Sequence, residues 1–192
     1  MRLFKTLLAV ATIAAAPLFA AEDENILVIE VAGETSGTVE IELLPEVAPR
    51  HVERIKRLTR DGLYDDVVFH RVIPDFMAQT GDVEHGQREG FNLRYAGIGG
   101  SAFPDLPAEF SDIEYETGVV GMARAQDPNS ANSQFFIMFA PAPFLNGQYT
   151  VVGKVLSGQD VVDSIKKGDQ SANGAVAEPD YMETVRIKAD IE

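Results

Sequence analysis

The stretch FHRVIPDFMAQTGD, residues Phe69–Asp82, decides how this sequence folds. It holds most of two strand candidates, Val67–Val72 and Phe76–Thr80. Strand alternation places Arg71 on one face with Phe69 and Ile73, and the adjacent His70 on the opposite face. Because an arginine is costly to bury unless it is paired or faces a cleft, two interpretations stay open. Arg71 either borders a cleft or is solvated on an edge strand.

Strand patterns continue on both sides of this stretch. Thr38–Leu43 alternates between apolar and polar residues, as a half-buried strand does, and is expected to form a hairpin with Asn25–Ala32. The sequence predicts further strands at Gly118–Ala123, Gln134–Phe139 and Thr150–Leu156, and a closing strand at Met182–Ile191.

Two segments have helical spacing instead. Apolar residues recur every three residues after Pro49 and predict an amphipathic helix that ends near Asp61-Gly62, and Asp160–Lys167 predicts a second, shorter helix. Seven or eight short strands with no alternation of strand and helix favour an antiparallel barrel or sandwich with helices at its ends. The long segments Val83–Glu116 and Gly168–Asp180 are expected to be functional or mobile loops.

Several kinds of chemistry are excluded or unsupported. The 192 residues include no cysteine, which rules out disulfides, cysteine nucleophiles and thiolate zinc sites. The three histidines show no metal-ligand spacing, so we expect no metal site, and no Gly-rich phosphate loop precedes a helix. Phe136, Phe139 and Phe144 are candidates to line an apolar pocket, although periodicity alone favours the protein core for them.

The N-terminus has the layout of a secretory signal peptide. Basic Arg2 and Lys5 precede an apolar run at residues 7–18, followed by small residues at Ala20 and Ala21. We therefore expect a cleaved signal at residues 1–21 and one mature domain at residues 22–192; an uncleaved anchor is the alternative, disfavoured because the apolar run is short. The signal holds two of 16 basic and none of 30 acidic residues, which leaves a net charge of −16. Such a chain is expected to repel nucleic acid and anionic membranes.

Three sequence blocks resemble the signature regions of cyclophilins, in the correct order. They are FHRVIPDFMAQTGD, SQFFI at Ser133–Ile137 and PFLNGQYTVVGKV at Pro143–Val155, and the similarity runs from about Ile26 to the C-terminal strand. The resemblance implies a mainly β fold: a closed eight-stranded antiparallel β-barrel capped by two α-helices, with a proline pocket on its outer face. It also implies peptidyl-prolyl cis/trans isomerase activity without metal or cofactor.

The same resemblance implies roles for individual residues. Arg71 matches the catalytic arginine, and Gln79 matches the glutamine that orients it. The backbone of the segment 123–125 matches the strand that pairs with the substrate peptide. The implied substrate-binding residues are Phe76, Met77, Ala123, Arg124, Ala125, Gln134, Phe136, Phe144, Leu145 and Tyr149.

Three positions depart from the best-known family members. Phe144 stands where those members have tryptophan, which implies weaker cyclosporin binding without loss of catalysis. Tyr149 replaces a histidine, and Arg124 replaces an asparagine and adds positive charge near the groove. The loop GGSAFPDLPAEFSD at residues 99–112 resembles bacterial members, which together with the signal implies a periplasmic protein.

We expect the substrates to be proline-containing segments of unfolded or partly folded exported proteins, bound by a monomer with possible chaperone-like peptide binding. Two other functions are weighed against this one. A module could hold proline peptides without turning them over, but Arg71, Gln79 and Phe136 argue against it. A lipocalin-like barrel could hold a small ligand, but the SQFFI block and the loop lengths do not fit it.

Overall fold

The computed structural model describes residues 23–191, so the expected signal peptide at residues 1–21 lies outside the described residues. The strand patterns form one antiparallel sheet of nine strands in the order β3-β9-β1-β2-β8-β6-β7-β5-β4. The strands are β1 (Ile26–Ala32), β2 (Gly37–Leu43), β3 (Val67–Val68), β4 (Arg71–Ile73), β5 (Met77–Thr80), β6 (Val119–Met122), β7 (Phe135–Met138), β8 (Val151–Ser157) and β9 (Tyr181–Ile187).

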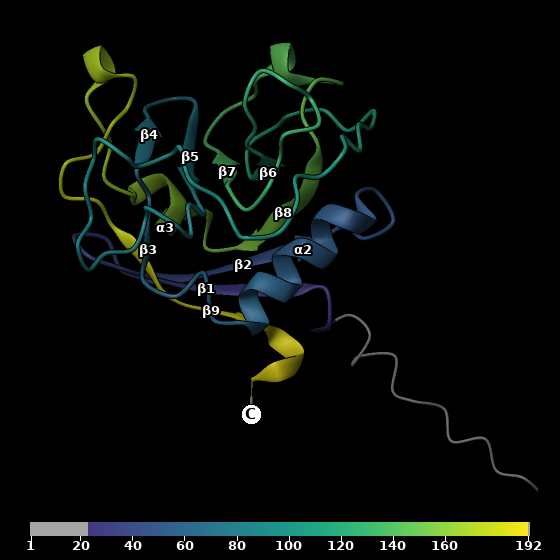
Figure 1. Ribbon diagram of the computed structural model, residues 1–192, viewed down its shortest axis with the longest axis horizontal. Coiled ribbons are helices and arrows are strands. Elements are labelled where there is room, and N and C mark those ends of the chain that lie inside the picture. Colours follow the sequence, from purple (N-terminus) through teal and green to yellow (C-terminus); the bar gives the residue numbers. More distant parts are fainter. Residues whose placement is uncertain (1–22, 192) are drawn as a thin grey trace, which may run out of the picture.

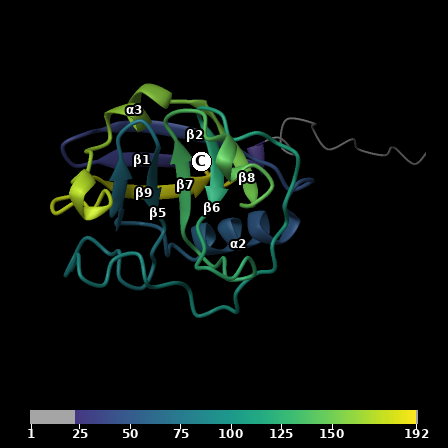
Figure 2. The same cartoon turned by 90° about the horizontal axis from the view of Figure 1, so that it is seen from above.

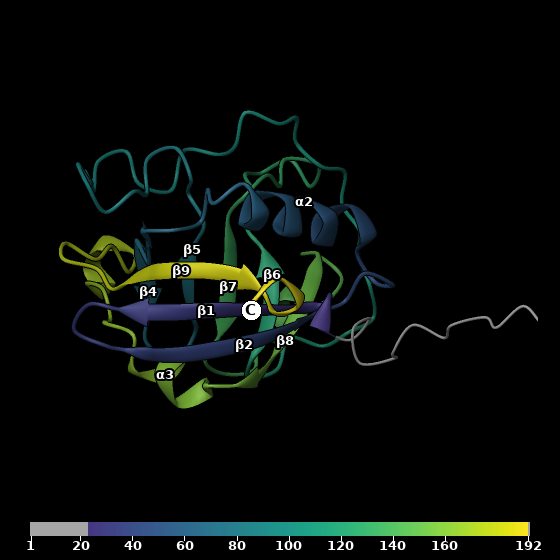
Figure 3. The same ribbon diagram turned by 90° about the horizontal axis from the view of Figure 1, so that it is seen from below.

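The sheet curls around its apolar interior, and a helix lies on each side of it. The helices are α2 (Pro49–Arg60) and α3 (Gln159–Ser164), and short 3-10 turns form at Pro143–Leu145, Gln170–Ala172 and Lys188–Asp190. Strands β9, β1 and β2 cross the lower part of the molecule, and β4, β5, β7 and β6 stand above them (Figure 1). Figures 2 and 3 show α2 and α3 on opposite sides of these strands. None of the helices in residues 23–191 is both long and apolar enough to span a bilayer.

The sheet is open, and the prediction of a closed eight-stranded barrel is wrong. The expected strand Val67–Val72 is interrupted at Phe69–His70, so its first part pairs with β9 and its last part with β5. At the break, the N–H of Phe69 donates to the carbonyl of Asp180 at 2.8 Å, and the N–H of Val176 donates to the carbonyl of His70 at 3.1 Å. One expected strand therefore becomes two, and these form the two edges of a curled sheet.

The same interruption changes which residues share a face with Arg71. Phe69 is buried in the interior core, whereas Arg71 and Ile73 point to the outer face, so the expectation that all three share a face is wrong. His70, which was expected to face away from Arg71, is buried. In one continuous strand Phe69 and Arg71 would point to the same face. Because the strand is interrupted between them, the chain turns and their side chains point to different faces.

Two apolar clusters lie on opposite faces of the sheet. The interior cluster takes inward residues such as Ala78, Val120 and Ile137, together with the buried face of α2. A second cluster lies on the outer face of β5, β6, β7 and β8, and its buried members are Met77, Tyr115, Val119, Phe136, Met138, Ala142, Leu145 and Val151. The outer face of these strands therefore has an apolar packing layer of its own.

The helix boundaries follow from local chemistry. The first helix was predicted correctly: it begins at Pro49, where a missing N–H costs nothing, and the Glu109 carboxylate accepts the N–H groups of Arg50 and His51 at 3.3 and 3.2 Å. Helix α3 ends at Ser164 rather than at Lys167, because Ile165 is extended with ψ 133°. The final strand ends at Ile187, four residues earlier than predicted, because a 3-10 turn follows it.

A buried carboxylate organises the beginning of the long loop at residues 83–116. Asp82 is fully buried and accepts hydrogen bonds from the N–H groups of Glu84, His85, Gly97 and Gly99 at 2.8 to 3.2 Å. Burying a carboxylate is costly unless its oxygens accept hydrogen bonds. Because the loop supplies these bonds, it is held against the sheet. The loop that the sequence left as functional or mobile is thus anchored beside the end of β5.

Candidate active site

Four residues form a row across four adjacent strands. The register pairs Arg71 of β4 with Gln79 of β5, Gln79 with Phe136 of β7, and Phe136 with Gly121 of β6. Directly opposed residues of neighbouring strands point to the same side of a sheet. Because Phe136 belongs to the outer apolar cluster, the whole row lies on the outer face, and Arg71 stands at its end.

A chain of side-chain hydrogen bonds fixes the polar end of this row. Arg71 Nη1 donates to Gln79 Oε1 at 3.1 Å, and Gln79 Nε2 donates to Gln134 Oε1 at 2.9 Å. Gln134 Nε2 in turn donates to the carbonyl of Gly99 at 2.8 Å. Since each amide accepts with its oxygen and donates with its nitrogen, the bonds run in one direction. That direction keeps the oxygen of Gln79 turned toward the guanidinium.

The other edge of the guanidinium is held by a residue that sequence reasoning missed. Arg71 Nε donates to the carbonyl oxygen of Asn173, and Arg71 Nη2 donates to Asn173 Oδ1, both at 3.1 Å. Burial lowers the pKa of Arg71, with an opposing effect from Tyr149, but an arginine stays charged at any ordinary pH. Its anchors are neutral acceptors, so the positive charge remains available to a ligand.

An apolar cavity of about 360 Å³ adjoins Arg71. Phe136 forms part of its lining and packs edge-on against Tyr149 with ring centroids 5.9 Å apart, and the rings of Phe76 and Phe144 lie 5.6 Å apart beside it. Phe144 is 66% exposed and therefore lies at the rim. Ten of the twelve predicted site residues line this cavity, namely Arg71, Phe76, Met77, Gln79, Ala123, Arg124, Phe136, Phe144, Leu145 and Tyr149; Gln148 lines it too and was not predicted.

A second hollow continues the cavity into a groove. It has a volume of about 510 Å³ and shares Gln79, Ala123 and Arg124 with the apolar cavity. Ala125 and Gln134, the two remaining predicted site residues, line it. The structure therefore brings all twelve residues to one continuous surface.

Phe139, one of the candidates for the apolar pocket, does not line it and lies with the core, the placement that periodicity favoured. Strand β7 ends at Met138, so the inward and outward alternation stops before Phe139. Its ring packs against the interior core and lies 4.3 Å from Lys167 Nζ. The sequence alone did not reveal where the strand ends.

Arg124 borders both hollows, and its side chain folds back on the rim. Its guanidinium lies 4.4 Å from the centre of the Tyr149 ring and donates to the carbonyls of Ala125, Gln126 and Gln148 at 2.9 to 3.2 Å. These bonds hold a positive charge at the junction of the two hollows. Arg124 thereby fixes the wall of the groove as well as its charge.

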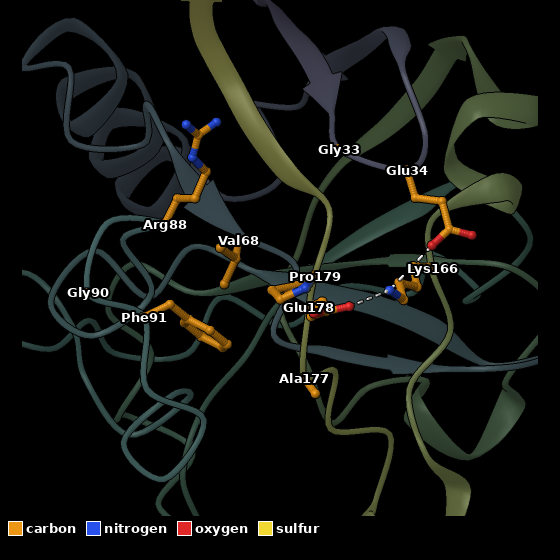
Figure 4. A pocket seen from close by; sticks show the side chains of 10 residues that line it. All are labelled: Gly33, Glu34, Val68, Arg88, Gly90, Phe91, Lys166, Ala177, Glu178 and Pro179. Carbon is orange, nitrogen blue, oxygen red and sulfur yellow. Dashed lines mark ion pairs between the residues drawn. The ribbon is translucent and has the colours of Figure 1, made fainter.

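Another hollow, of about 630 Å³, lies elsewhere and contains none of the predicted site residues. Figure 4 shows its charged lining: Lys166 Nζ is 3.3 Å from a Glu34 oxygen and 3.8 Å from a Glu178 oxygen. Its lysine is thus paired within the chain. Across the same described residues, no group of three or more His, Asp or Glu side chains could hold a metal ion.

Comparison with known proteins places this site in context. The profile of the family described as "Cyclophilin type peptidyl-prolyl cis-trans isomerase/CLD" matches residues 26–187. A probable peptidyl-prolyl cis-trans isomerase of Brucella suis is 58% identical over 172 residues, covering 89% of this chain and 86% of the relative. Peptidyl-prolyl cis-trans isomerase B of Bacillus subtilis is 38% identical over 137 residues, covering 71% of this chain and 88% of the relative.

Solved structures show the same fold. The cyclophilin AquaCyp293 from Hirschia baltica superposes with a TM-score of 0.73 at 27% identity, covering 88% of this chain and 76% of that one. A cyclophilin-type isomerase of Cryptosporidium parvum, crystallised in the presence of the dipeptide Ala-Pro, gives a TM-score of 0.70 at 24% identity and covers 84% of this chain and 98% of that one.

The curled sheet, with an anchored arginine beside a cavity on its outer face, agrees with the class that these relatives define: enzymes that rotate the peptide bond before proline. The family profile spans nearly all of the described chain, and the Brucella relative is similar over nearly its whole length. The chain belongs to the cyclophilin-type peptidyl-prolyl cis/trans isomerases.

Proposed function

We propose that this isomerase acts on proline-containing segments of unfolded or partly folded exported proteins, with Arg71 as its catalytic residue. The observation that carries the proposal is the charged guanidinium of Arg71, held by Gln79 and Asn173 at the mouth of an apolar cavity. The Ala-Pro dipeptide named with the Cryptosporidium relative supports the class of ligand.

Arg71 acts on the barrier to rotation without making or breaking a covalent bond. Amide resonance opposes rotation of the X-Pro bond with a barrier of about 20 kcal/mol. A donor to the prolyl nitrogen localises the lone pair of that nitrogen, and the C–N bond loses double-bond character. A fixed guanidinium supplies such a donor in a prearranged position, which is the usual origin of electrostatic catalysis.

The apolar cavity holds the proline ring still while the preceding carbonyl swings. Phe136, Met77 and Leu145 are nearly completely buried and give the cavity rigid apolar walls, and Phe76 and Phe144 form its rim. Excluding water removes hydrogen bonds that favour the planar amide and strengthens the interaction with Arg71. The adjoining hollow gives the chain beyond the proline a place to bind in extended form, where Gln134 and the segment 123–125 contact it.

The two adjoining hollows also support the proposal of chaperone-like holding of extended chains. Exported clients and a periplasmic location are inferred from the N-terminal signal layout and the bacterial character of the loop at residues 99–112. The excess of acidic residues keeps such a protein away from nucleic acids and anionic lipid. The proposed working form is a monomer without metal or cofactor.

The role of Arg71 is tested with the mature protein and its Arg71→Ala and Arg71→Lys variants. Isomerisation of a short Ala-Pro peptide is followed by exchange NMR, and folding is checked by circular dichroism. We expect kcat/KM to fall at least about tenfold in both folded variants, equivalent to about 1.4 kcal/mol of transition-state stabilisation. A folded Arg71→Ala variant that is as fast as the wild type would refute the assignment.

Export and holding are tested separately. Fractionation of the source cells should place a shortened chain outside the cytosol, and a cytosolic chain with an intact N-terminus would refute the proposed clients. Chaperone-like holding is tested by following the aggregation of a denatured protein by light scattering, with and without this protein. The Arg71→Ala variant should suppress aggregation as the wild type does, because the groove remains; no suppression by either protein would refute chaperone-like binding.

A further inference from the structure

We propose that Asn173 is a positioning residue for the isomerase reaction: it holds one edge of the Arg71 guanidinium so that the remaining N–H groups face the substrate. This inference rests on the proposed catalytic role of Arg71. Asn173 is 102 residues away in sequence and belongs to the segment Gly168–Asp180, not to any strand.

Counting donors shows what Asn173 contributes. A guanidinium has five N–H donors in one plane. Asn173 accepts from Nε with its backbone oxygen and from Nη2 with Oδ1, and Gln79 accepts from Nη1, so both edges of the plane are held. One N–H of each terminal nitrogen is left over, although Nη1 also lies 3.9 Å from the sulfur of Met77. Asn173 therefore takes one donor of Nη2 and fixes the plane of the guanidinium, and this sets the direction in which the other donor of Nη2 points.

The backbone conformation of Asn173 suits this double contact. It is left-handed, with φ 56° and ψ 34°, a region that asparagine tolerates better than most residues with a side chain. Its N–H donates to the carbonyl of Gln170 at 3.2 Å and closes a 3-10 turn, whose start is capped by the Asp169 carboxylate on the N–H of Ser171 at 2.8 Å. The turn presents the carbonyl and the side-chain oxygen of one residue to the same guanidinium.

The turn is fixed against the strand that carries Arg71. The N–H of Val72 donates to the carbonyl of Gly174 at 2.7 Å, and the N–H of Gly168 donates to the carbonyl of Val72 at 2.9 Å. A Cβ on Gly174 would lie 2.4 Å from Ile73 Cγ1, so only glycine permits this close approach. Asn173 and Arg71 are therefore parts of one rigid unit, as a prearranged catalytic group requires.

The neutral amide of Asn173 matters as much as its position. A carboxylate here would hold the guanidinium more strongly but would cancel much of the charge that polarises the prolyl nitrogen. A side chain without an acceptor would leave Nη2 free to turn toward water. The amide oxygen orients the donor and leaves the charge of Arg71 intact.

The variant Asn173→Gly tests the inference, because glycine keeps the left-handed backbone and the main-chain acceptor but removes Oδ1. Exchange NMR with an Ala-Pro peptide gives the turnover rate and the peptide affinity separately. We expect kcat to fall about tenfold, or about 1.4 kcal/mol, while the peptide Kd changes less than twofold and the melting temperature does not fall. Ala172→Gly, which loosens the same turn without touching Arg71, should leave kcat within twofold of the wild type.

A second comparison separates positioning from a structural role. In an Arg71→Ala background, Asn173→Gly should cause no further loss of kcat, because Asn173 acts only through Arg71. An unchanged kcat in the single variant would overturn the inference, and so would an equal loss in the Arg71→Ala background. If Arg71→Ala itself retains full activity, the proposed role of Arg71 fails instead, and the two failures are thus distinguishable.

Discussion

Gly121 is the place where one added methyl group is expected to damage both the stability and the activity of the enzyme. It lies directly opposite Phe136, on the neighbouring strand β6, in the row of residues across the sheet. A Cβ at this position would lie 2.5 Å from Phe136 Cζ and 2.5 Å from the hydroxyl oxygen of Tyr115. These two rings stack on each other with centroids 5.8 Å apart, and both are nearly completely buried.

The size of the effect follows from this geometry. Carbon atoms in contact sit about 3.5–4.0 Å apart, so the rings must move by about 1 Å. Overpacking of this kind costs about 1–3 kcal/mol, and each kcal/mol lowers the melting temperature by about 2–4 °C in a domain of this size. Because the Phe136 ring is pushed toward the cavity, we expect Gly121→Ala to lower kcat/KM at least about tenfold, the scale of one misfitted methylene group in an apolar pocket.

Thermal unfolding and the Ala-Pro isomerisation assay measure the two effects. Gly90→Ala is a matched control: it also introduces a side chain, at φ 77°, but has no atom within 4 Å, so it should cost about 1 kcal/mol of stability and leave activity unchanged. Adding Phe136→Leu to Gly121→Ala removes the atom at Cζ and should recover part of the lost stability. A Gly121→Ala enzyme with wild-type melting temperature and activity would refute the reasoning.

Three further predictions concern pH, the long loop and the cavity rim. Burial lowers the pKa of His70 from 6.5 to about 4, so the unfolded chain binds more protons between these values, and stability that is complete above pH 6.5 is lost as the pH falls toward 4. Urea unfolding at pH 7 and pH 4 should show His70 contributing about 3 kcal/mol to the difference; an equal difference in His70→Asn would contradict this. Asp82→Asn replaces one acceptor oxygen by a donor, so hydrogen exchange at the amides of Gly97 and Gly99 should accelerate, and unchanged protection would show that the carboxylate does not anchor the loop. Phe144→Trp should tighten cyclosporin binding in calorimetry with activity kept within about threefold (about 0.7 kcal/mol), and an unchanged affinity would show that the ring at this rim position does not limit binding.

The parts of the fold that depend on local pattern could be predicted from the sequence. Period-two alternation located β2, and helical spacing with Pro49 at its start located α2. The family blocks then indicated residues that prove to share one continuous groove. Local pattern is sufficient here because burial on one face of a strand or helix makes apolar residues recur at a regular spacing in the sequence.

The parts that depend on distant partners could not be predicted. The strand break at Phe69–His70 arises from hydrogen bonds to Val176 and Asp180, which lie more than a hundred residues further along the chain. Asn173 was missed for the same reason. The dipeptide Asn173-Gly174 indicates a turn, but nothing in the nearby sequence shows that this turn packs on β4. The sequence therefore indicated three of the four residues in the row across the sheet, and it did not indicate Asn173, which anchors its end.

The split strand has a consequence for an isomerase whose proposed substrates are unfolded chains. An exposed sheet edge is a template on which an extended chain can add itself as a further strand and start aggregation. Strands β3 and β4, the two edges, are only two and three residues long. The N–H groups of Val68 and Val72 donate to the carbonyls of Gly86 and Gly174 in the flanking loops. An extended chain of the kind proposed as a substrate would thus find few free backbone groups to pair with along either edge, which would leave the groove as the place for it to bind.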